Sequence, residues 1–337
     1  MTTEDGSNFT MPKNRLSLRL ALGLAATLLT AGIGYAATIF SSGFESGFTG
    51  WGKELCCSYS AVIGTSPTYP VREGTHSVKF TLNKTDPDVQ GSKRAELRLG
   101  AIPANSEYTY RFSIFIPTTY QRDASSEILT QWHEYPDFNL GETWRSPPLG
   151  LFTANDNWSL FNKSDPRPKT PSNTDPGITS QAWNLGPIAK GQWTDFVFHV
   201  KWSYQSNGVL EVWKNGQLVV KKYGPNTYND RVGPYMKLGF YKWGWKSQPQ
   251  RSTTTQRVAY FDAVRIDQGN TSLAVSSTAT PRSLKGGSTT AARRLKGDKT
   301  ITPRHSVNRQ NNKLLPEKGA YKQHSKSNLE SSSTIQR

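Results

Sequence analysis

Apolar and polar residues alternate along much of the chain between residues 38 and 268. In the segment YTYRFSIFIP, every second residue from Tyr108 to Ile116 is apolar or aromatic. A period of two predicts a strand that buries one face, because alternate side chains of a strand point the same way. DFVFHVKW repeats this alternation from Phe196 to Trp202, and RVAYFDAVRID predicts a closing strand.

Turn signals separate these predicted strands. GVLEVWKNGQLVVKK predicts a hairpin that turns at Asn215-Gly216, and LGLFTANDNWSLF predicts a second hairpin. The stretch 135–190 is otherwise rich in Pro, Asn, Asp, Ser and Gly, so we expect an irregular wall beside a ligand groove. The whole pattern predicts an all-β fold, namely two antiparallel sheets packed as a jelly-roll sandwich with a concave groove.

Composition divides the chain into three parts. Lys13, Arg15 and Arg19 precede an apolar run at 20–34, and small residues end at Ala36. This order predicts a signal peptide at residues 1–36 and a secreted protein, extracellular or periplasmic, with an uncleaved anchor as the alternative. We expect no other membrane span.

Of the net charge of +16, the C-terminal residues 270–337 hold +10 and the first 36 hold +1. Residues 37–269 therefore carry +5, which suits an anionic ligand. The basic tail, 270–337, nearly lacks aromatic residues and is predicted to be disordered. It is either a solvated tail or an adhesive segment for nucleic acid, acidic glycan or a cell surface. We expect a monomer without specific nucleic-acid recognition.

The two cysteines are adjacent, Cys56 and Cys57. A disulfide between neighbours closes a strained ring, so two half-buried thiols are the expected state. No Cys/His spacing typical of a metal site is present.

Three predicted strands carry an apolar face and a polar face. They lie in SKRAELRLG, ILTQWHEYPD and YMKLGFYKW. Their polar faces comprise Arg94, Glu96, Arg98, Gln131, His133, Tyr235, Lys237 and Tyr241. Taken singly, the charged row is as well explained by solvated ion pairs, and the histidine by a structural hydrogen bond. If the strands share a sheet, the set joins an imidazole, a phenol, an amide and several cations, which suits chemistry on a carboxylate-bearing substrate.

These segments resemble the three motifs of jelly-roll polysaccharide lyases. The alginate lyases of this type carry R-(T/S)-E-(L/V)-R, Q-(I/V)-H and Y-F-K-A-G-x-Y-x-Q. The matching segments are, in order, Arg94-Ala95-Glu96-Leu97-Arg98, Gln131-Trp132-His133 and Tyr235-Met236-Lys237-Leu238-Gly239-Phe240-Tyr241. The wider sequence, about 40–268, is similar to the heparin lyase I and glucuronan lyase group. Ala95 and Trp243 depart from the alginate motifs, which puts the substrate in doubt more than the chemistry.

The resemblance implies β-elimination on a uronate-containing, anionic polysaccharide. It implies that Arg94 and Gln131 bind the uronate carboxylate, and that His133 and Tyr241 supply the base and the acid. In one variant histidine removes the C5 proton and tyrosine protonates the leaving oxygen. In the other, tyrosine does both and His133 helps to neutralise the carboxylate. The choice stays open, as does the polymer: glucuronan, alginate or a heparin-like chain.

Further contacts to substrate are expected from the charged and phenolic neighbours of these residues: Arg98, Glu96, Lys237, Lys242 and Tyr235. The reaction needs no metal or organic cofactor. A structural calcium is possible at Glu45 and Asp262, in the predicted first and last strands, where related sandwiches often bind one.

Two other functions fit parts of the sequence. A non-catalytic glycan-binding module would use Trp51, Trp243 and Trp245 to stack on sugars, but it leaves the Gln/His/Tyr set unexplained. A sandwich glycoside hydrolase needs two acids that flank the bond, and the signature E-x-D-x-E is absent.

Overall fold

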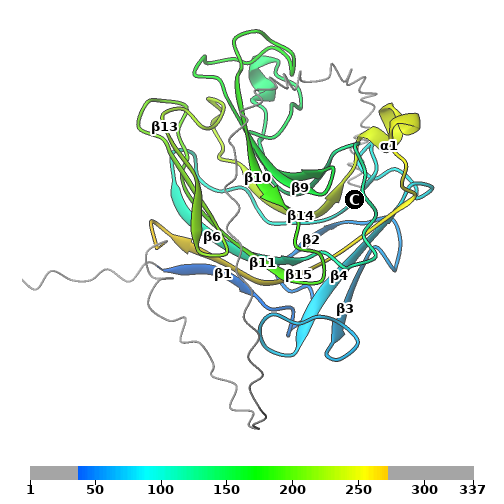
Figure 1. Ribbon diagram of the computed structural model, residues 1–337. Helices are drawn as coiled ribbons and strands as arrows, with labels where there is room; N and C mark the ends of the chain where they lie inside the picture. The colour runs from blue at the N-terminus through cyan, green and yellow to red at the C-terminus, as the bar shows by residue number, and fades with distance from the viewer. Residues whose placement is uncertain (1–36, 272–337) are drawn as a thin grey trace, which may run out of the picture. The chain divides into compact units, whose positions relative to one another are not determined.

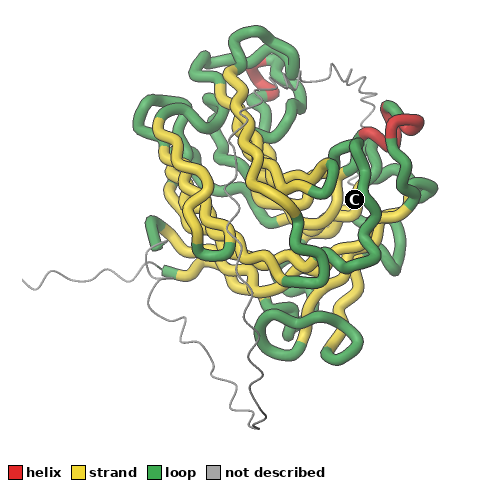
Figure 2. The backbone as a smooth tube through the Cα atoms, viewed as in Figure 1, coloured by secondary structure: helices red, strands yellow, loops and turns green. Residues whose placement is uncertain are grey.

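The computed structural model describes residues 37–271, so the predicted signal peptide and nearly all of the predicted tail lie outside the described residues. The described part consists of two antiparallel sheets with little helix (Figures 1 and 2). The predicted all-β, two-sheet architecture is confirmed. No helix within residues 37–271 is long and apolar enough to cross a membrane.

We call the first sheet the back sheet. Its strands are β1 (Thr38–Ser42), β3 (Ala61–Thr65), β4 (His76–Asn83), β6 (Glu107–Phe115), β11 (Trp193–Lys201), β12 (Val209–Lys214), β13 (Gln217–Tyr223) and β15 (Gln256–Gln268). The spatial order is β13-β12-β11-β6-β15-β4-β3, and β1 also pairs with β15. The predicted hairpin is present, with Asn215 and Gly216 both at positive φ between β12 and β13.

We call the second sheet the groove sheet. Its strands are β2 (Gly52–Glu54), β5 (Arg94–Arg98), β7 (Glu127–His133), β8 (Leu149–Ala154), β9 (Asn157–Ser164), β10 (Thr179–Pro187) and β14 (Tyr235–Tyr241). The spatial order is β10-β9-β8-β7-β14-β5-β2. The predicted hairpin β8–β9 is present, but β10 was missed because its exposed, polar sequence TSQAWNLGP gives no apolar alternation.

The core lies between the two sheets and is built from the apolar faces that the alternation predicted. Trp132 of the groove sheet packs against Phe198 of the back sheet, with ring centres 4.7 Å apart. Both side chains are fully buried, and each such burial contributes about 2 to 3 kcal/mol. Because Trp132 points inward, its neighbours Gln131 and His133 point to the opposite face of β7.

Short helices lie in the connections: η1 (Phe138–Leu140), α1 (Gly244–Ser247) and η2 (Pro249–Arg251). In Figure 1, η1 is the teal turn at the top, beyond β9 and β10. The stretch 135–190 is thus less irregular than predicted, since it contains β8, β9, β10 and η1.

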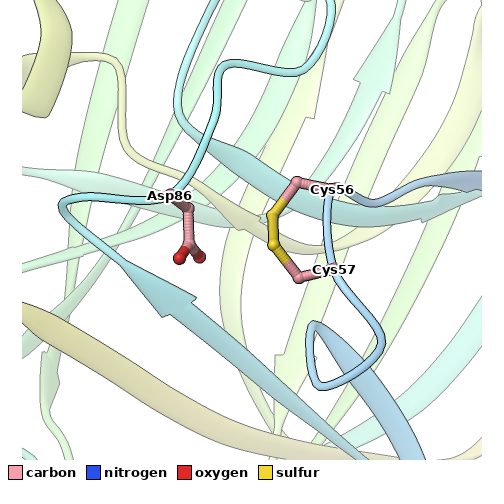
Figure 3. A group of neighbouring side chains, drawn as sticks. All are labelled: Cys56, Cys57 and Asp86. Carbon is pink, nitrogen blue, oxygen red and sulfur yellow. A yellow bond between two sulfur atoms is a disulfide. The ribbon is translucent and has the colours of Figure 1, made fainter.

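Cys56 and Cys57 form a vicinal disulfide, which corrects the prediction of two thiols (Figure 3). Their Cα atoms are 3.8 Å apart, the spacing of a trans peptide. The turn after β2 closes the ring while the Cys56–Cys57 peptide stays trans, which the prediction from ring strain did not allow for. Asp86 lies beside the pair, but its carboxylate already accepts hydrogen bonds from Tyr59 and Asn83.

Candidate active site

The three motif strands are neighbours in the groove sheet, in the order β7-β14-β5. On β14, Tyr235 is opposite His133 of β7, and Lys237 lies between Gln131 and Arg98. The expected gathering of the polar faces on one sheet is therefore confirmed.

Gly239 allows β14 to pair with both β5 and β7. It adopts φ +125°, and β14 has an extra residue relative to β7 between Leu238 and Tyr241. A Cβ at Gly239 would lie 2.1 Å from the carbonyl oxygen of Ala95 on β5. Only glycine fits this conformation at such close approach. The motif glycine thus shapes the strand that carries Lys237 and Tyr241.

A cavity of about 330 Å³ opens above these strands. Five predicted site residues line it: Arg94, Arg98, His133, Tyr235 and Lys237. Glu54, Gln90, Leu99, Ala101, Tyr135, Trp144 and Arg145 complete the lining. The other predicted residues, Glu96, Gln131, Tyr241 and Lys242, do not line it.

The cavity floor is a network of buried charges. Glu54 Oε2 accepts hydrogen bonds from Arg94 Nη1 at 3.0 Å and from Lys237 Nζ at 2.8 Å. Burial raises the pKa of Glu54, but Lys237 and Arg94 outweigh burial and lower the pKa below its ordinary value. Arg98 adds a third cation, 3.7 Å from Glu54 and half exposed. With Glu96 as the second carboxylate, three cations face two anions, which leaves a positive floor that attracts a carboxylate.

Gln131 and Glu96 lie beneath this floor. Gln131 Nε2 donates a hydrogen bond to Glu96 Oε1, and both side chains are buried. Glu96 also accepts from Arg94. Gln131 Oε1 is buried without a hydrogen-bond partner among the described residues. In this arrangement Gln131 orients the carboxylate that holds Arg94.

The ring of His133 has one occupied nitrogen. Nδ1 lies 2.9 Å from the carboxylate Oε2 of Glu134 and 3.2 Å from the carbonyl oxygen of Glu134. Both groups can only accept, so Nδ1 carries the proton in the neutral ring, and the lone pair is on Nε2. His133 lines the cavity, and no described residue forms a hydrogen bond or ion pair with Nε2.

Glu134 is held in place from behind. It is almost fully buried, and Oε1 accepts the backbone N–H of Arg145 at 2.7 Å. A buried carboxylate at Nδ1 fixes the ring and stabilises an imidazolium when Nε2 gains a proton. The sequence signal was available, since Glu134 directly follows His133, the last residue of β7.

Two tyrosines of β14 lie at different places. Tyr235 stacks on His133, with ring centres 5.7 Å apart and an interplanar angle of 28°. Burial, together with Glu54, Glu134 and Glu96, raises the pKa of Tyr235 above its ordinary value, so this phenol stays protonated. Tyr241 lies opposite Arg94, whose guanidinium is 4.6 Å above the tyrosine ring. At about 3.3 Å per residue, Tyr241 lies roughly 20 Å along β14 from Tyr235.

Lys242 points away from the cavity. Its Nζ pairs with Glu127 and, at 3.1 Å, with Asp123, and the side chain is completely buried. This places Lys242 between the sheets, where alternation with Leu238 and Phe240 would put it. Lys242 is close to Tyr241 in the sequence, but this alternation directs its side chain away from the cavity. The structure therefore gives Lys242 no contact with the cavity, and we leave it out of the proposed site.

Glu45 and Asp262 show no shared metal site. Glu45 lies in the turn after β1, not in the first strand, and its carboxylate accepts hydrogen bonds from Thr75 and His76. The Asp262 carboxylate accepts three backbone N–H groups. Within residues 37–271, the group of side chains spaced for a metal is Cys56, Cys57 and Asp86. The structural calcium stays a prediction.

The tryptophans expected to stack on sugars are mostly internal. Trp51 and Trp245 are buried, and Trp51 packs against Phe40 and Phe44. The exposed aromatic residues near the cavity are instead Tyr135 and Phe138, for which the sequence pattern gives no signal. Glu54 and Arg145 were also missed, because each depends on contacts made across strands or loops, and Glu134 was missed although it adjoins His133.

Comparisons with known proteins agree with the geometry. A glucuronan lyase from the fungus Trichoderma reesei matches with a TM-score of 0.56 and 20% identity, over 69% of this chain and 96% of that one. The alginate lyase A1-II′ matches with a TM-score of 0.48 and 14% identity, over 68% and 100%. The likeness to the fungal enzyme shows the fold. No curated protein matches the sequence. A family model described as polysaccharide lyase matches residues 63–265. Since this match spans more than half of the 337 residues, the chain belongs to the polysaccharide lyase family and is an enzyme that acts on polysaccharides.

Proposed function

We propose that the protein is a secreted lyase that cleaves a uronate-containing polysaccharide by β-elimination. The observation that carries the proposal is the cavity itself. It joins an excess of cations, which suits a carboxylate, to a lining histidine whose Nε2 has no hydrogen-bond partner among residues 37–271. The fungal enzyme with the same fold is a glucuronan lyase, so glucuronan is the first polymer to test.

The first step of the reaction is neutralisation of the carboxylate. The C5 proton of a uronate is a weak acid while the adjacent carboxylate keeps its full charge. Arg94, Lys237 and Arg98 surround the cavity with donors that stabilise the carboxylate and, more strongly, the enolate that develops from it. Gln131 contributes from below through Glu96, which fixes Arg94.

The second step is elimination. His133 Nε2 takes the C5 proton, the released electron pair forms the C4–C5 double bond, and the C4–O bond breaks. A phenol then donates a proton to the leaving oxygen. Glu134 stabilises the imidazolium that forms in this step, in the manner of a carboxylate behind a general base. Side chains of the protein thus accept and donate the protons that this step requires.

The family motif names Tyr241 as the phenol, but along β14 its backbone lies roughly 20 Å from Tyr235, the residue opposite His133. The structure adds Tyr235 as a second candidate, since it stacks on His133 and keeps its proton. If a single tyrosine performs both proton transfers, we propose Tyr241, because it lies beside Arg94. His133 then helps to neutralise the substrate carboxylate. Each choice of base is therefore tied to a different tyrosine, which makes it testable by single substitutions.

The proposal is tested by incubating the mature protein with glucuronan, alginate and heparin separately. The absorbance of the unsaturated product near 235 nm is followed. We expect a rise with a uronate polymer and none with the His133→Ala variant. New reducing ends without absorbance would indicate a hydrolase. Retention on the polymer without cleavage would indicate a binding module. Either result overturns the assignment.

A further inference from the structure

We propose that Tyr135, Phe138 and Trp144 form a subsite that binds the apolar face of an anionic sugar ring next to the catalytic cavity. We call these three residues the aromatic shelf. The inference rests on the proposed function for the identity of the polymer. It assigns a place and a mode of binding to a part of the chain outside the three motifs.

The shelf is an exposed apolar cluster. The side chains of Tyr135 and Phe138 are 45% and 53% exposed. The ring centre of Trp144 lies 5.4 Å from that of Tyr135 and 5.7 Å from that of Phe138. Leu140, two residues after Phe138 in η1, is also exposed. Contiguous apolar groups of this kind on a soluble domain mark a binding surface.

The shelf is continuous with the cavity. Tyr135 and Trp144 both line it. The ring of Trp144 contacts that of His133 with centres 5.5 Å apart, and Tyr135 lies 6.1 Å from Tyr235. A polymer held at His133 and longer than the cavity therefore continues onto the shelf. This continuity makes the substrate chain the occupant that the geometry favours.

Buried ion pairs hold the shelf in place. Glu142 accepts the backbone N–H of Asp137 at 2.8 Å and that of Thr170 at 2.6 Å. Arg145 pairs with Glu142 and makes two hydrogen bonds to Asp230, at 2.7 and 2.9 Å. A segment braced on both sides presents its rings without an ordering cost when the ligand arrives. The exposure of these rings is thus a fixed feature of the fold.

Exposed cations flank the shelf and favour a sugar ring that carries a negative charge. Arg231 is 71% exposed and lies 3.4 Å from Asp137, the residue before η1. The exposed Lys169 lies near Gly141, the residue after η1. A sugar with an apolar C–H face and a carboxylate at its edge matches aromatic rings beside exposed cations. A uronate residue has both properties.

The test compares Phe138→Ala with Tyr223→Ala in the mature chain. Among residues 37–271 the ring of the exposed Phe138 packs against that of Trp144 alone, so its removal leaves the fold intact. Tyr223 is 64% exposed on β13, at the edge of the back sheet, and serves as the matched control. On polymeric glucuronan, we expect Phe138→Ala to raise KM about three- to tenfold and to leave kcat within about twofold, as for the loss of one aromatic contact. Tyr223→Ala should match the wild type.

A second measurement separates this inference from the proposed function. Each variant is combined with His133→Ala, and its retention is measured in a native gel that contains glucuronan. If the wild type cleaves but Phe138→Ala changes neither KM nor retention, the shelf is wrong and the lyase assignment stands. If the wild type cleaves nothing but Phe138→Ala weakens retention, the shelf stands alone. Equal effects of Phe138→Ala and Tyr223→Ala, or no cleavage and no retention of the wild type, also overturn the shelf.

Discussion

Two histidines, one on the outward face of each sheet, differ in their surroundings. One is placed for a structural role and the other for a chemical role. His199 of the back sheet lies between two carboxylates, with Nδ1 3.0 Å from Glu211 and Nε2 2.7 Å from Glu107. His133 of the groove sheet has a carboxylate at Nδ1 alone, and its ring borders a cavity. A histidine with both nitrogens occupied fixes strands together. A histidine with one nitrogen open can exchange a proton with a ligand.

The surroundings of the two rings differ in the same sense. Beside His199, Glu211 also pairs with Lys221 at 3.2 Å, so the charged groups there pair with one another within the back sheet. The cavity beside His133 has more cations than anions and an opening above them. The difference indicates that the cations of the groove sheet are not fully neutralised by neighbouring carboxylates and can bind a substrate carboxylate. The charged groups near His199 are instead paired with one another.

The largest expected effect is on kcat, and it distinguishes the two histidines. His133→Ala and Tyr241→Phe should each lower kcat on a uronate polymer by about 10²- to 10⁴-fold, the usual contribution of a positioned acid or base. His199→Ala should leave kcat within a few-fold and lower the free energy of unfolding by about 1 to 3 kcal/mol, because Glu211 loses a partner. Steady-state kinetics and urea unfolding measure the two quantities. Near-normal turnover in both groove variants would end the assignment.

Tyr235→Phe completes that experiment, because Tyr235 is the phenol that stacks on His133. Loss of turnover in Tyr241→Phe with activity kept in Tyr235→Phe supports the motif position. The reverse result moves the proton donor to Tyr235.

The next effect concerns the carboxylate behind His133. Glu134→Gln keeps the volume and removes the charge that favours an imidazolium. We expect kcat to fall about 10- to 100-fold. We also expect the limb of the pH–rate profile that reports His133 to move to lower pH, because protonation of the ring would need more acid. Besides Glu134, the ionisable groups around the ring are Tyr235 of β14, Tyr135 and Arg145 of the following loop, and Arg94, Lys237 and Glu54 of the floor.

The matched control is Glu211→Gln, which makes the same change beside His199. It should leave the pH–rate profile unchanged. A purely structural role of Glu134 would lower activity at every pH without moving the limb.

A third effect contrasts two glycines, one in each sheet. Gly239→Ala should cost about 3 kcal/mol or more, since the new Cβ would meet the Ala95 carbonyl and φ is +125°. Gly216→Ala, in the hairpin of the back sheet, has φ +79° and no atom within 4 Å of the new Cβ, so about 1 kcal/mol is expected. Urea unfolding of both variants measures the difference. Equal losses would show that close packing at Gly239 does not shape β14.

The smallest effect is a pH dependence of stability in the back sheet. Burial works to raise the pKa of Glu211, but hydrogen bonds from His199 and Lys221 outweigh it and lower the pKa below its ordinary value. A lowered pKa adds stability above the unfolded value, about 4.3 for glutamate, and this stability is lost as the pH falls through the folded value. The free energy of unfolding should therefore drop more between about pH 5 and pH 3 in the wild type than in Glu211→Gln. Parallel curves would contradict this.

The sequence determined many of the strands, though not β10, together with their inward faces and the three motifs, because a period of two reflects burial directly in the order of residues. It also placed Gln131 and His133 on one face through the inward Trp132, and parity could have placed Lys242 in the core. Only the tertiary structure decided that β7, β14 and β5 are neighbours and that Tyr235 faces His133. Glu54, Arg145 and the aromatic shelf also needed the fold. Their roles come from contacts across strands and loops, and the separation of these residues along the chain does not encode such contacts.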